Sequence, residues 1–379
     1  MAKLGELGKI ITGNTPKTSD AQNYESNDIC FVKPSDFTDN EITEIHQSEF
    51  YISAYAKDRA RVLPTDSILV TCIGIIGKVA INKVPCAFNQ QINAIVPEKK
   101  VCDPRYIAYA IQNLQPKMQS TANAAVVPIL NKTQFSNLEV PLLPVGEQKQ
   151  IACNLNKIDK LIFLRKQQID KLDELAKARF VEMFGDPVKN TMDWEIKPLS
   201  ELGELNRGVS KARPRNSPEL LGGPYPLIQT GEVANAKTYI TSFNSTYSEK
   251  GLAQSKMWPK GTLCITIAAN IAQTSILTFD ACFPDSVVGF ISRNMTNELF
   301  IHYWFSFFQK ILDEQAPQVA QKNINLKILS ELNVIVPPLS LQNRFAAFVE
   351  RVDKQKQTVQ QSLEKLELMK KALMQEYFG

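Results

Sequence analysis

Two long stretches without proline or glycine constrain the fold of this 379-residue chain more than any other feature of its sequence. Neither residue occurs in 147–184 or 339–378, and all 21 prolines lie outside 145–186 and 339–379. Elsewhere Pro, Gly, Asn or Asp interrupts the chain every few residues. Because these residues end helices and form turns, the sequence predicts two long helices and two mixed α/β globular regions.

Apolar residues recur at heptad spacing in both predicted helices, which is the pattern of helices that pair as a coiled coil. The heptad seams hold Ile151, Leu155, Ile158, Ile162, Ile169, Leu172, Phe345, Val349, Val352, Val359, Leu363 and Leu366. Lys356 and Lys370 stand at seam positions where apolar residues are expected, although long Lys stems can cover apolar surface. Packing of each helix on a globular domain is the alternative.

The two helical stretches are copies of one another. Residues 131–185 align with 325–379 without a gap at 17 identities in 55 positions, a period of 194 residues. The second helix must then run antiparallel to the first if the two pair. We predict an α+β fold with a pseudo-two-fold repeat: α/β globular domains at 1–144 and 186–338, and long helices at 145–185 and 339–379.

Composition places the chain among ordinary globular proteins. The net charge is +4 and 44% of the residues are hydrophobic, which excludes a mainly disordered chain. The longest apolar stretches, 68–76 and 299–308, are shorter than the roughly 18 residues of a membrane span. Seven cysteines without a Cys-x-x-Cys pair indicate reduced, mostly buried thiols, so we expect a cytoplasmic protein.

The sequence lacks the signatures of several enzyme classes. It contains no Walker A loop, no Gly-x-Gly-x-x-Gly and no Asp/Asn-Pro-Pro-Tyr/Phe run of amino-methyltransferases. Only two histidines are present, and His302 lies in an apolar helical run, where a structural role is expected. We therefore predict no catalytic residues, no metal site and no enzyme activity in this chain.

Polar loops at equivalent places in both halves are candidates for DNA contact, because Asn and Gln can bond adenine, Arg and Lys guanine, and Asp and Glu cytosine. The candidates are Thr15, Lys17, Lys33, Ser35, Asp36, Asn89, Gln90, Gln91, Arg207, Lys211, Arg213, Arg215, Gln229, Thr230, Glu232, Lys322 and Asn323. A solvated basic loop at 207–215 and structural amides at Gln90 and Gln91 are the alternatives.

The start of each helix resembles that of a known family. Val140-Pro141-Leu142-Leu143-Pro144-Val145-Gly146-Glu147-Gln148 and Val336-Pro337-Pro338-Leu339-Ser340-Leu341-Gln342 are similar to the Pro-rich, Gln-containing start of the spacer helix in specificity (S) subunits of type I restriction–modification systems. Asn89-Gln90-Gln91-Ile92 resembles a run in their target recognition domains. The resemblance covers the whole chain.

The resemblance implies a non-catalytic DNA reader. Each domain would recognise one half of a bipartite, asymmetric target, and the helices would set the gap and bind two copies of a methyltransferase (M) subunit. S-adenosylmethionine, Mg and ATP would be bound by the methyltransferase and restriction (R) subunits and not by this chain. Gln148, Asp159, Gln342 and Asp353 repeat within the helices and are candidate M-subunit contacts, although capping or solvation is an equal alternative.

Two other function classes stay open on the sequence alone. One is a stand-alone nucleic-acid enzyme with an unrecognised site, and the other is a coiled-coil scaffold that does not bind DNA. Duplicated helices joined to divergent globular domains favour a protein that recognises two DNA sites over one with a single catalytic pocket. The target sequence cannot be derived from the chain, because docking geometry and water decide which side chains reach the bases.

Overall fold

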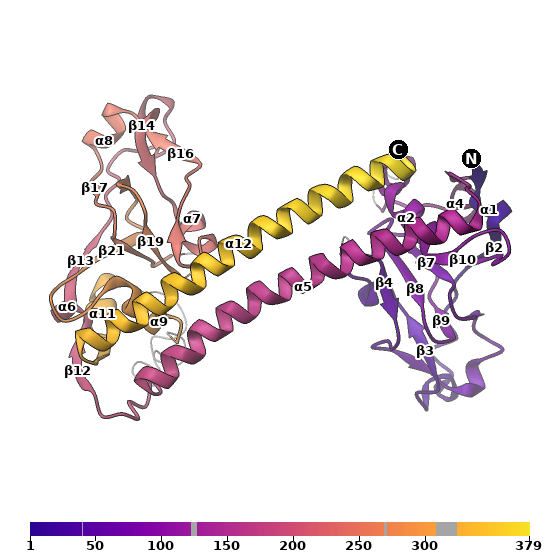
Figure 1. Cartoon of the computed structure of the whole chain (residues 1–379), viewed down its shortest axis with the longest axis horizontal. Coiled ribbons are helices and arrows are strands. Elements are labelled where there is room, and N and C mark those ends of the chain that lie inside the picture. The colour runs from indigo at the N-terminus through magenta and orange to yellow at the C-terminus, as the bar shows by residue number, and fades with distance from the viewer. Residues whose placement is uncertain (40, 123–126, 269–270, 308–323) are drawn as a thin grey trace. The chain divides into compact units, whose positions relative to one another are not determined.

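The computed structural model describes residues 1–39, 41–122, 127–268, 271–307 and 324–379 (Figure 1). They form two compact units. Unit 1 comprises residues 1–167 and 360–379, and unit 2 comprises residues 168–359. Each unit contains one α/β head, a segment of the first long helix and a segment of the second.

Both predicted long helices are present. Helix α5 spans Val145–Phe184 and α12 spans Leu339–Phe378, each with 40 residues (Figure 1). Each begins after a proline, whose carbonyl accepts the first helical hydrogen bonds: Glu147 N–H donates to Pro144 and Leu341 N–H to Pro338, both over 2.9 Å. The predicted seams are less exposed than the flanks, with Leu155 and Val349 fully buried.

The head of unit 1 contains two sheets. The first has the strand order β2 (Gly8–Thr12), β10 (Ile92–Pro97), β7 (Ile68–Thr71), β8 (Val79–Asn82) and β4 (Thr43–Ile45). The second has the order β5 (Tyr51–Ile52), β3 (Ile29–Val32), β9 (Cys86–Phe88) and β6 (Val62–Leu63). The β4–β8 and β3–β9 pairs are parallel and the other pairs are antiparallel.

Short helices and a two-stranded ribbon complete this head. They are β1 (Ala2–Lys3), β11 (Glu139–Val140), α1 (Leu4–Leu7), α2 (Pro104–Asn113), α3 (Gln115–Thr121), α4 (Lys132–Ser136) and three 3-10 turns, η1 (Ala21–Tyr24), η2 (Pro34–Asp36) and η3 (Ala54–Ala56). Asp103 caps α2, accepting from the Tyr106 N–H over 3.0 Å. Helix α2 is buried against the first sheet and both long-helix segments, and Tyr106 packs on Phe378 with ring centroids 5.1 Å apart.

Unit 2 repeats the strand order of both sheets. Its first sheet has the order β13 (Gly203–Arg207), β21 (Val287–Ser292), β18 (Leu263–Thr266), β19 (Thr274–Leu277) and β15 (Tyr239–Ile240). Its second sheet has the order β16 (Ser245–Tyr247), β14 (Leu221–Leu227), β20 (Ala281–Cys282) and β17 (Met257–Trp258). The parallel pairs, β15–β19 and β14–β20, fall at the same places as in unit 1.

The remaining elements of unit 2 also correspond to those of unit 1. They are β12 (Glu195–Pro198), β22 (Asn333–Val336), α6 (Leu199–Leu202), η4 (Pro218–Leu220), α7 (Thr230–Asn235), α8 (Glu249–Ala253), α9 (Glu298–Phe305) and α11 (Leu326–Glu331). Phe180, Phe184, Phe300 and Phe345 join α5, α9 and α12 in one buried aromatic cluster. The duplication seen in the helical sequences therefore extends to the strand order of both sheets in each head.

Candidate nucleic-acid interface

Two loops of unit 1 that carry predicted base-reading residues lie together. The loop after β2 holds Thr15, whose Oγ1 donates to Oε1 of Gln90 in the β9–β10 loop over 2.7 Å, and both side chains are exposed. Asn89 is only 7% exposed and donates from Nδ2 to Gln91 Oε1 over 2.8 Å. Thr15 and Gln90 thus present polar atoms to solvent, while Asn89 shapes the loop and orients Gln91.

Glycine permits the close approach of these loops in both heads. A Cβ at Gly13 would lie 2.0 Å from the carbonyl oxygen of Asn89. At the corresponding position in unit 2, a Cβ at Gly208 would lie 2.2 Å from the carbonyl oxygen of Phe283. Any side chain would push the loops apart, so both heads place the segment after the first strand against the loop that precedes the last strand.

The other candidates of unit 1 divide into exposed and internally bonded side chains. Lys17 and Ser35 are exposed. Lys33 lies with its Nζ 3.1 Å from the centroid of the Phe50 ring, a cation–π contact that leaves the charge partly accessible. Asp36 Oδ2 accepts from the Lys33 N–H over 2.8 Å and from Ser48 Oγ over 3.0 Å.

Asp36 is therefore a capping residue, as is its counterpart in unit 2. Glu232 Oε2 accepts from the Gln229 N–H over 3.2 Å, and Glu232 Oε1 accepts from Asn244 Nδ2 over 3.0 Å. Both carboxylates accept internal bonds that fix their loops, and contact of either one with cytosine stays a prediction. Gln229 is exposed and Thr230 is partly exposed.

Sequence reasoning missed a basic segment in unit 1. Lys57, Arg59 and Arg61 are all exposed and follow η3. Arg59 stacks over Tyr55, with its guanidinium carbon 3.9 Å from the ring centroid. Asn14 ties this segment to the predicted loop, because its Nδ2 donates to the Arg59 carbonyl over 2.7 Å and its Oδ1 accepts from the Arg61 N–H over 2.9 Å. Three cations among the five residues 57–61 are the sequence feature that could have predicted this segment.

The basic loop of unit 2 is less uniform than its sequence suggests. Arg215 Nη2 binds both carboxylate oxygens of Asp285, over 2.7 and 2.9 Å. Arg213 Nη1 donates to two carbonyls of its own loop, each over 2.8 Å. Arg207 and Lys211 are exposed, and among the described residues neither side chain has a bonded partner. These two residues are the stronger candidates for phosphate contact.

Two exposed lysines extend this surface. Lys256 lies over Trp258, with its Nζ 3.9 Å from the ring centroid, and Lys250 pairs with Glu219 over 3.2 Å. Gln254 joins their segment to the basic loop: its carbonyl accepts from the Lys211 N–H over 3.4 Å. The remaining candidates of this head, Lys322 and Asn323, lie outside the described residues.

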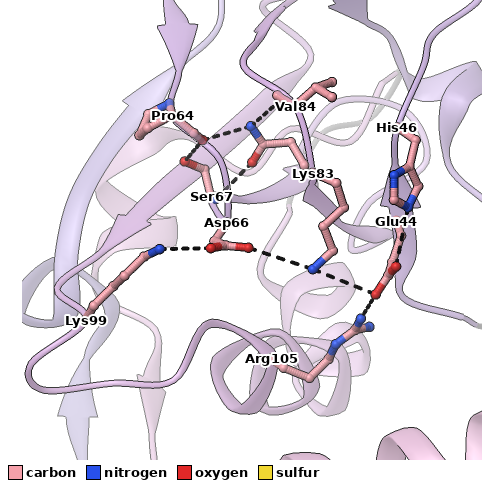
Figure 2. A network of polar contacts seen from close by, with 10 residues as sticks. Glu44, His46, Pro64, Asp66, Ser67, Lys83, Val84, Lys99 and Arg105 are labelled. Carbon is pink, nitrogen blue, oxygen red and sulfur yellow. Dashed lines mark hydrogen bonds and ion pairs between the residues drawn. The ribbon is translucent and has the colours of Figure 1, made fainter.

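The opposite end of the first sheet of unit 1 carries charges that neutralise one another (Figure 2). Lys99 binds Asp66 over 2.8 Å and Lys83 lies 3.7 Å from the same carboxylate, while Arg105 binds Glu44. The hydrogen bond from Lys99 holds the pKa of Asp66 below its usual range. Because β10 begins after the Gln90 loop and ends two residues before Lys99, this network is remote from the candidate interface.

Gln148 and Gln342 serve the fold and not a partner. Both are fully buried at the start of their helices. Gln148 Nε2 donates to the carbonyls of Val101 and Leu143 over 3.1 and 2.7 Å, and its Oε1 accepts from the Asp103 N–H over 2.8 Å. No polar atom of the side chain is left for an M subunit, so the predicted interface role is corrected to the capping alternative.

Asp159 and Asp353 occupy the junction of each head with the long helices. Asp159 Oδ2 accepts from the Tyr109 hydroxyl over 2.7 Å and its Oδ1 lies 2.7 Å from Lys370 Nζ. Asp353 Oδ1 lies 3.2 Å from Lys356 Nζ, and burial raises the pKa of this carboxyl. Both residues are largely engaged within their own unit and present little surface to a partner.

Apolar side chains on the outside of the long helices were not anticipated. The exposed ones are Leu161, Phe163, Leu164, Leu368 and Met369 in unit 1, and Leu175, Val181 and Leu339 in unit 2. Met369 and Leu175 occupy equivalent places, 194 residues apart. An exposed apolar set on a helix indicates a surface that a partner covers.

The described residues were also searched for a catalytic histidine, disulfides, a metal site and a membrane-spanning helix. His302 is partly buried and lies beside Thr274, whose Oγ1 is 2.9 Å from His302 Nδ1. All seven cysteines are free, and six of them are buried, with Cys153 exposed. Within the described ranges no group of three His, Cys, Asp or Glu side chains could hold a metal ion. No described helix is both long and apolar enough to cross a membrane.

Comparison with known proteins identifies the relatives of this duplicated α/β architecture. The model of the type I restriction modification DNA specificity domain matches twice, at residues 1–174 and 191–368. The MjaX specificity subunit of a type I restriction enzyme from Methanocaldococcus jannaschii is 25% identical over 79% of this chain and 73% of its own length. The MjaIX specificity subunit from the same organism is 27% identical over 54% and 52%.

A solved structure has the same fold. The S subunit of a type I restriction–modification system from M. genitalium superposes with a TM-score of 0.61 at 14% identity, over 100% of this chain and 95% of that one. The fold and site thus define a two-headed protein with a basic loop cluster on each head. The chain belongs to the family of type I restriction modification DNA specificity domains and carries two of them.

Proposed function

We propose that this chain is the non-catalytic DNA-reading subunit of a type I restriction–modification complex. Each head reads one half of a bipartite, asymmetric target in duplex DNA. The observation that carries the proposal is the double match to the DNA specificity domain, together with two heads of equal topology. The family name of that domain and the names of the relatives support the same reading.

The heads differ where DNA would be read. Unit 1 offers the exposed Thr15–Gln90 pair, whereas unit 2 offers Arg207 and Lys211 at the corresponding loop. An amide can bond adenine and a guanidinium can bond guanine in the major groove, so different loops on the same scaffold favour different half-sites. The surrounding lysines and arginines supply phosphate contacts, which position the head without reading sequence.

The long helices bind the catalytic partners in this proposal. Two methyltransferase subunits dock on them, one near each head, because a duplicated surface suits a partner present in two like copies. Met369 and Leu175 are exposed at equivalent places and Leu161 and Leu164 add apolar area near the first, which supports this location. Restriction subunits join the same complex.

Cofactors belong to the partners in this proposal. S-adenosylmethionine is bound by the methyltransferase subunits, and ATP and Mg by the restriction subunits. This chain contributes recognition and geometry only. The cytoplasm, where the chromosome and these cofactors are found, is the location that we infer.

Exchange of one head tests the proposal. Residues 1–144 are replaced by those of another family member, the chain is assembled with its methyltransferase partner, and methylated adenines are mapped on genomic DNA. We expect one half of the target to change and the other half to stay. A chimera with residues 186–338 exchanged is the matched control, and it should change the other half. Alteration of both halves by a single exchange contradicts modular reading.

The spacer role has its own test. One heptad inserted between Leu161 and Leu172, with a matching heptad in α12, lengthens the pair by about 10 Å. At about 3.4 Å per base pair this corresponds to at most roughly three more base pairs between the half-sites. The half-site sequences should persist while the gap grows. An unchanged gap in an active complex contradicts the spacer role.

A further inference from the structure

Two lysines stand in the apolar seam of the long helix α12, and each meets an aspartate of α5. Lys370 Nζ lies 2.7 Å from Asp159 Oδ1 in unit 1, and Lys356 Nζ lies 2.5 Å from Asp173 Oδ1 in unit 2. The lysine side chains are only 16% and 13% exposed. Ion pairs this shielded from solvent are weakly screened, unlike ordinary surface pairs.

Each aspartate also binds its own head through the other carboxylate oxygen. Asp159 Oδ2 accepts from the Tyr109 hydroxyl over 2.7 Å, and Asp173 Oδ2 accepts from Lys237 Nζ over 3.0 Å. In both units one carboxylate therefore joins three parts: the head, α5 and α12. Burial would lower the pKa of Lys356, but the hydrogen bond to Asp173 raises it overall, so this lysine stays charged.

The two pairs keep one register. From the Lys356 pair to the Lys370 pair, the chain advances by 14 residues along α12 and goes back by 14 residues along α5. Each unit by itself thus aligns its two helix segments in the same antiparallel register, and the pairs are spaced by two heptads.

Neighbouring registers are unfavourable for both lysines. A slip of one heptad in one direction places Lys356 opposite Phe180 and Lys370 opposite Lys166. A slip in the other direction places Lys356 opposite Lys166 and Lys370 opposite Ala152. In either slip Lys370 loses its carboxylate, Lys356 keeps only Asp353 of its own helix, and one of the two lysines faces the like charge of Lys166, whereas the apolar seam residues would tolerate the slip.

We propose that Asp159–Lys370 and Asp173–Lys356 are positioning pairs that specify the register of the long helices and lock each head to that register. The pairs make the folded chain less stable than apolar packing would, but they restrict the two helices to one register, as a polar residue in a coiled-coil seam does. A slip of one heptad displaces one helix along the other by about 10 Å. If the proposed DNA-reading function holds, the same pairs fix the gap between the half-sites; the register itself does not depend on that function.

Crosslinking in the full chain tests the register directly. The exposed Cys153 is replaced by serine, and Leu161→Cys is combined with Met369→Cys, Ser362→Cys or Glu376→Cys, then treated with a short bifunctional maleimide. The first combination reports the register of the structure, and the other two report slips of one heptad. We expect at least ten-fold faster crosslinking of the 161/369 combination.

The key variant carries Lys356→Leu, Lys370→Leu, Asp159→Leu and Asp173→Leu. It should remain folded, and crosslinking of the off-register combinations should rise to within about three-fold of the 161/369 rate. The matched control removes two exposed lysines from the same helix, Lys365→Leu and Lys371→Leu, and should keep the original ratio. A key variant that folds and keeps the ten-fold preference overturns the proposal, because the heads alone would then set the register.

Charge exchange keeps the test decisive if the key variant does not fold. Lys370→Asp alone should raise off-register crosslinking, and Lys370→Asp combined with Asp159→Lys should restore the ten-fold preference. Equal behaviour of the single and double variants overturns the proposal. Neither assay contains DNA or a partner subunit, so failure here is distinguishable from failure of the proposed function.

Discussion

Gln342 repeats, 194 residues later, the hydrogen bonds that Gln148 makes. Its Nε2 donates to the carbonyls of Met295 and Pro337 over 3.0 and 2.9 Å, and its Oε1 accepts from the Asn297 N–H over 3.3 Å and, in addition, from Thr296 Oγ1 over 2.9 Å. In each unit one buried amide thus joins the loop before the head's buried helix to the turn that starts a long helix. The glutamine fixes the angle at which the helix leaves the head.

Replacement of either glutamine by leucine should destabilise its unit. The change leaves two carbonyls without partners, together with one donor at Gln148 and two donors at Gln342. Each lost bond is worth about 1–3 kcal/mol, so we expect a loss of about 2–4 kcal/mol after partial relaxation. Urea unfolding of Gln148→Leu and Gln342→Leu measures the loss. Gln150→Leu, at an exposed position on the same helix, is the control, and a loss no larger than that of the control would refute the assignment.

The sequence predicted the long helices almost to the residue. The absence of Pro and Gly can be recognised from neighbouring residues alone. The gapless duplication independently predicted the same helix bounds in both copies. The observed starts at Val145 and Leu339 agree with the predicted windows. Antiparallel pairing followed from connectivity alone, because the second helix must return along the first.

The candidate interface was less predictable because its chemistry depends on contacts distant in sequence. Arg215 is paired with Asp285, which lies 70 residues away, so charge counting within the loop overstated the free positive charge. The capping roles of Asp36 and Glu232 are local, since each carboxylate accepts from the backbone N–H three residues before it. Local spacing could have found these bonds, whereas the Arg215 partner required the fold.

Loss of exposed cations from the candidate interface of unit 1 should weaken DNA binding on every sequence. Lys17→Gln, Lys57→Gln and Arg59→Gln together remove three exposed cations. For each phosphate contact that is lost, the slope of the logarithm of the binding constant against the logarithm of the salt concentration should become less negative by about 0.9. Binding of the assembled complex to cognate and scrambled duplexes at several salt concentrations measures the slope. Lys9→Gln, Lys100→Gln and Lys117→Gln remove the same charge elsewhere on unit 1 and should leave the slope almost unchanged; equal effects of both sets would exclude a local interface.

The four cations of the unit 2 loop should separate into two classes. Arg207→Gln with Lys211→Gln should reduce affinity, either uniformly through lost phosphate contacts or by about 1–3 kcal/mol on the cognate site if one of them reads guanine. Arg215→Gln should have a smaller effect, because its guanidinium is already bound to Asp285. The same titration compares the two variants. A larger loss from Arg215→Gln would show that the Asp285 pair opens on DNA.

His302 should make unit 2 sensitive to acid. Burial lowers its pKa to about 4, from an ordinary value of 6.5, and the nearby Lys356 and Lys177 act in the same direction. Between these two values the unfolded chain binds a proton that the folded unit does not. Stability is therefore complete above about pH 6.5 and is lost as the pH falls toward 4, by at most roughly 3 kcal/mol.

Comparison of His302→Gln with the parent isolates this contribution, because other titrating groups such as Asp353 are common to both proteins. Urea unfolding is followed by tryptophan fluorescence at pH 7, 6 and 5, and it reports unit 2, since all three tryptophans, Trp194, Trp258 and Trp304, lie there. The difference in unfolding free energy should shift in favour of the variant by about 1.4 kcal/mol per pH unit below 6.5. His46→Gln changes the only other histidine, which is 66% exposed, and is the matched control. A parent and a His302→Gln variant that lose stability in parallel from pH 7 to pH 5 would show that His302 takes up its proton in the folded unit.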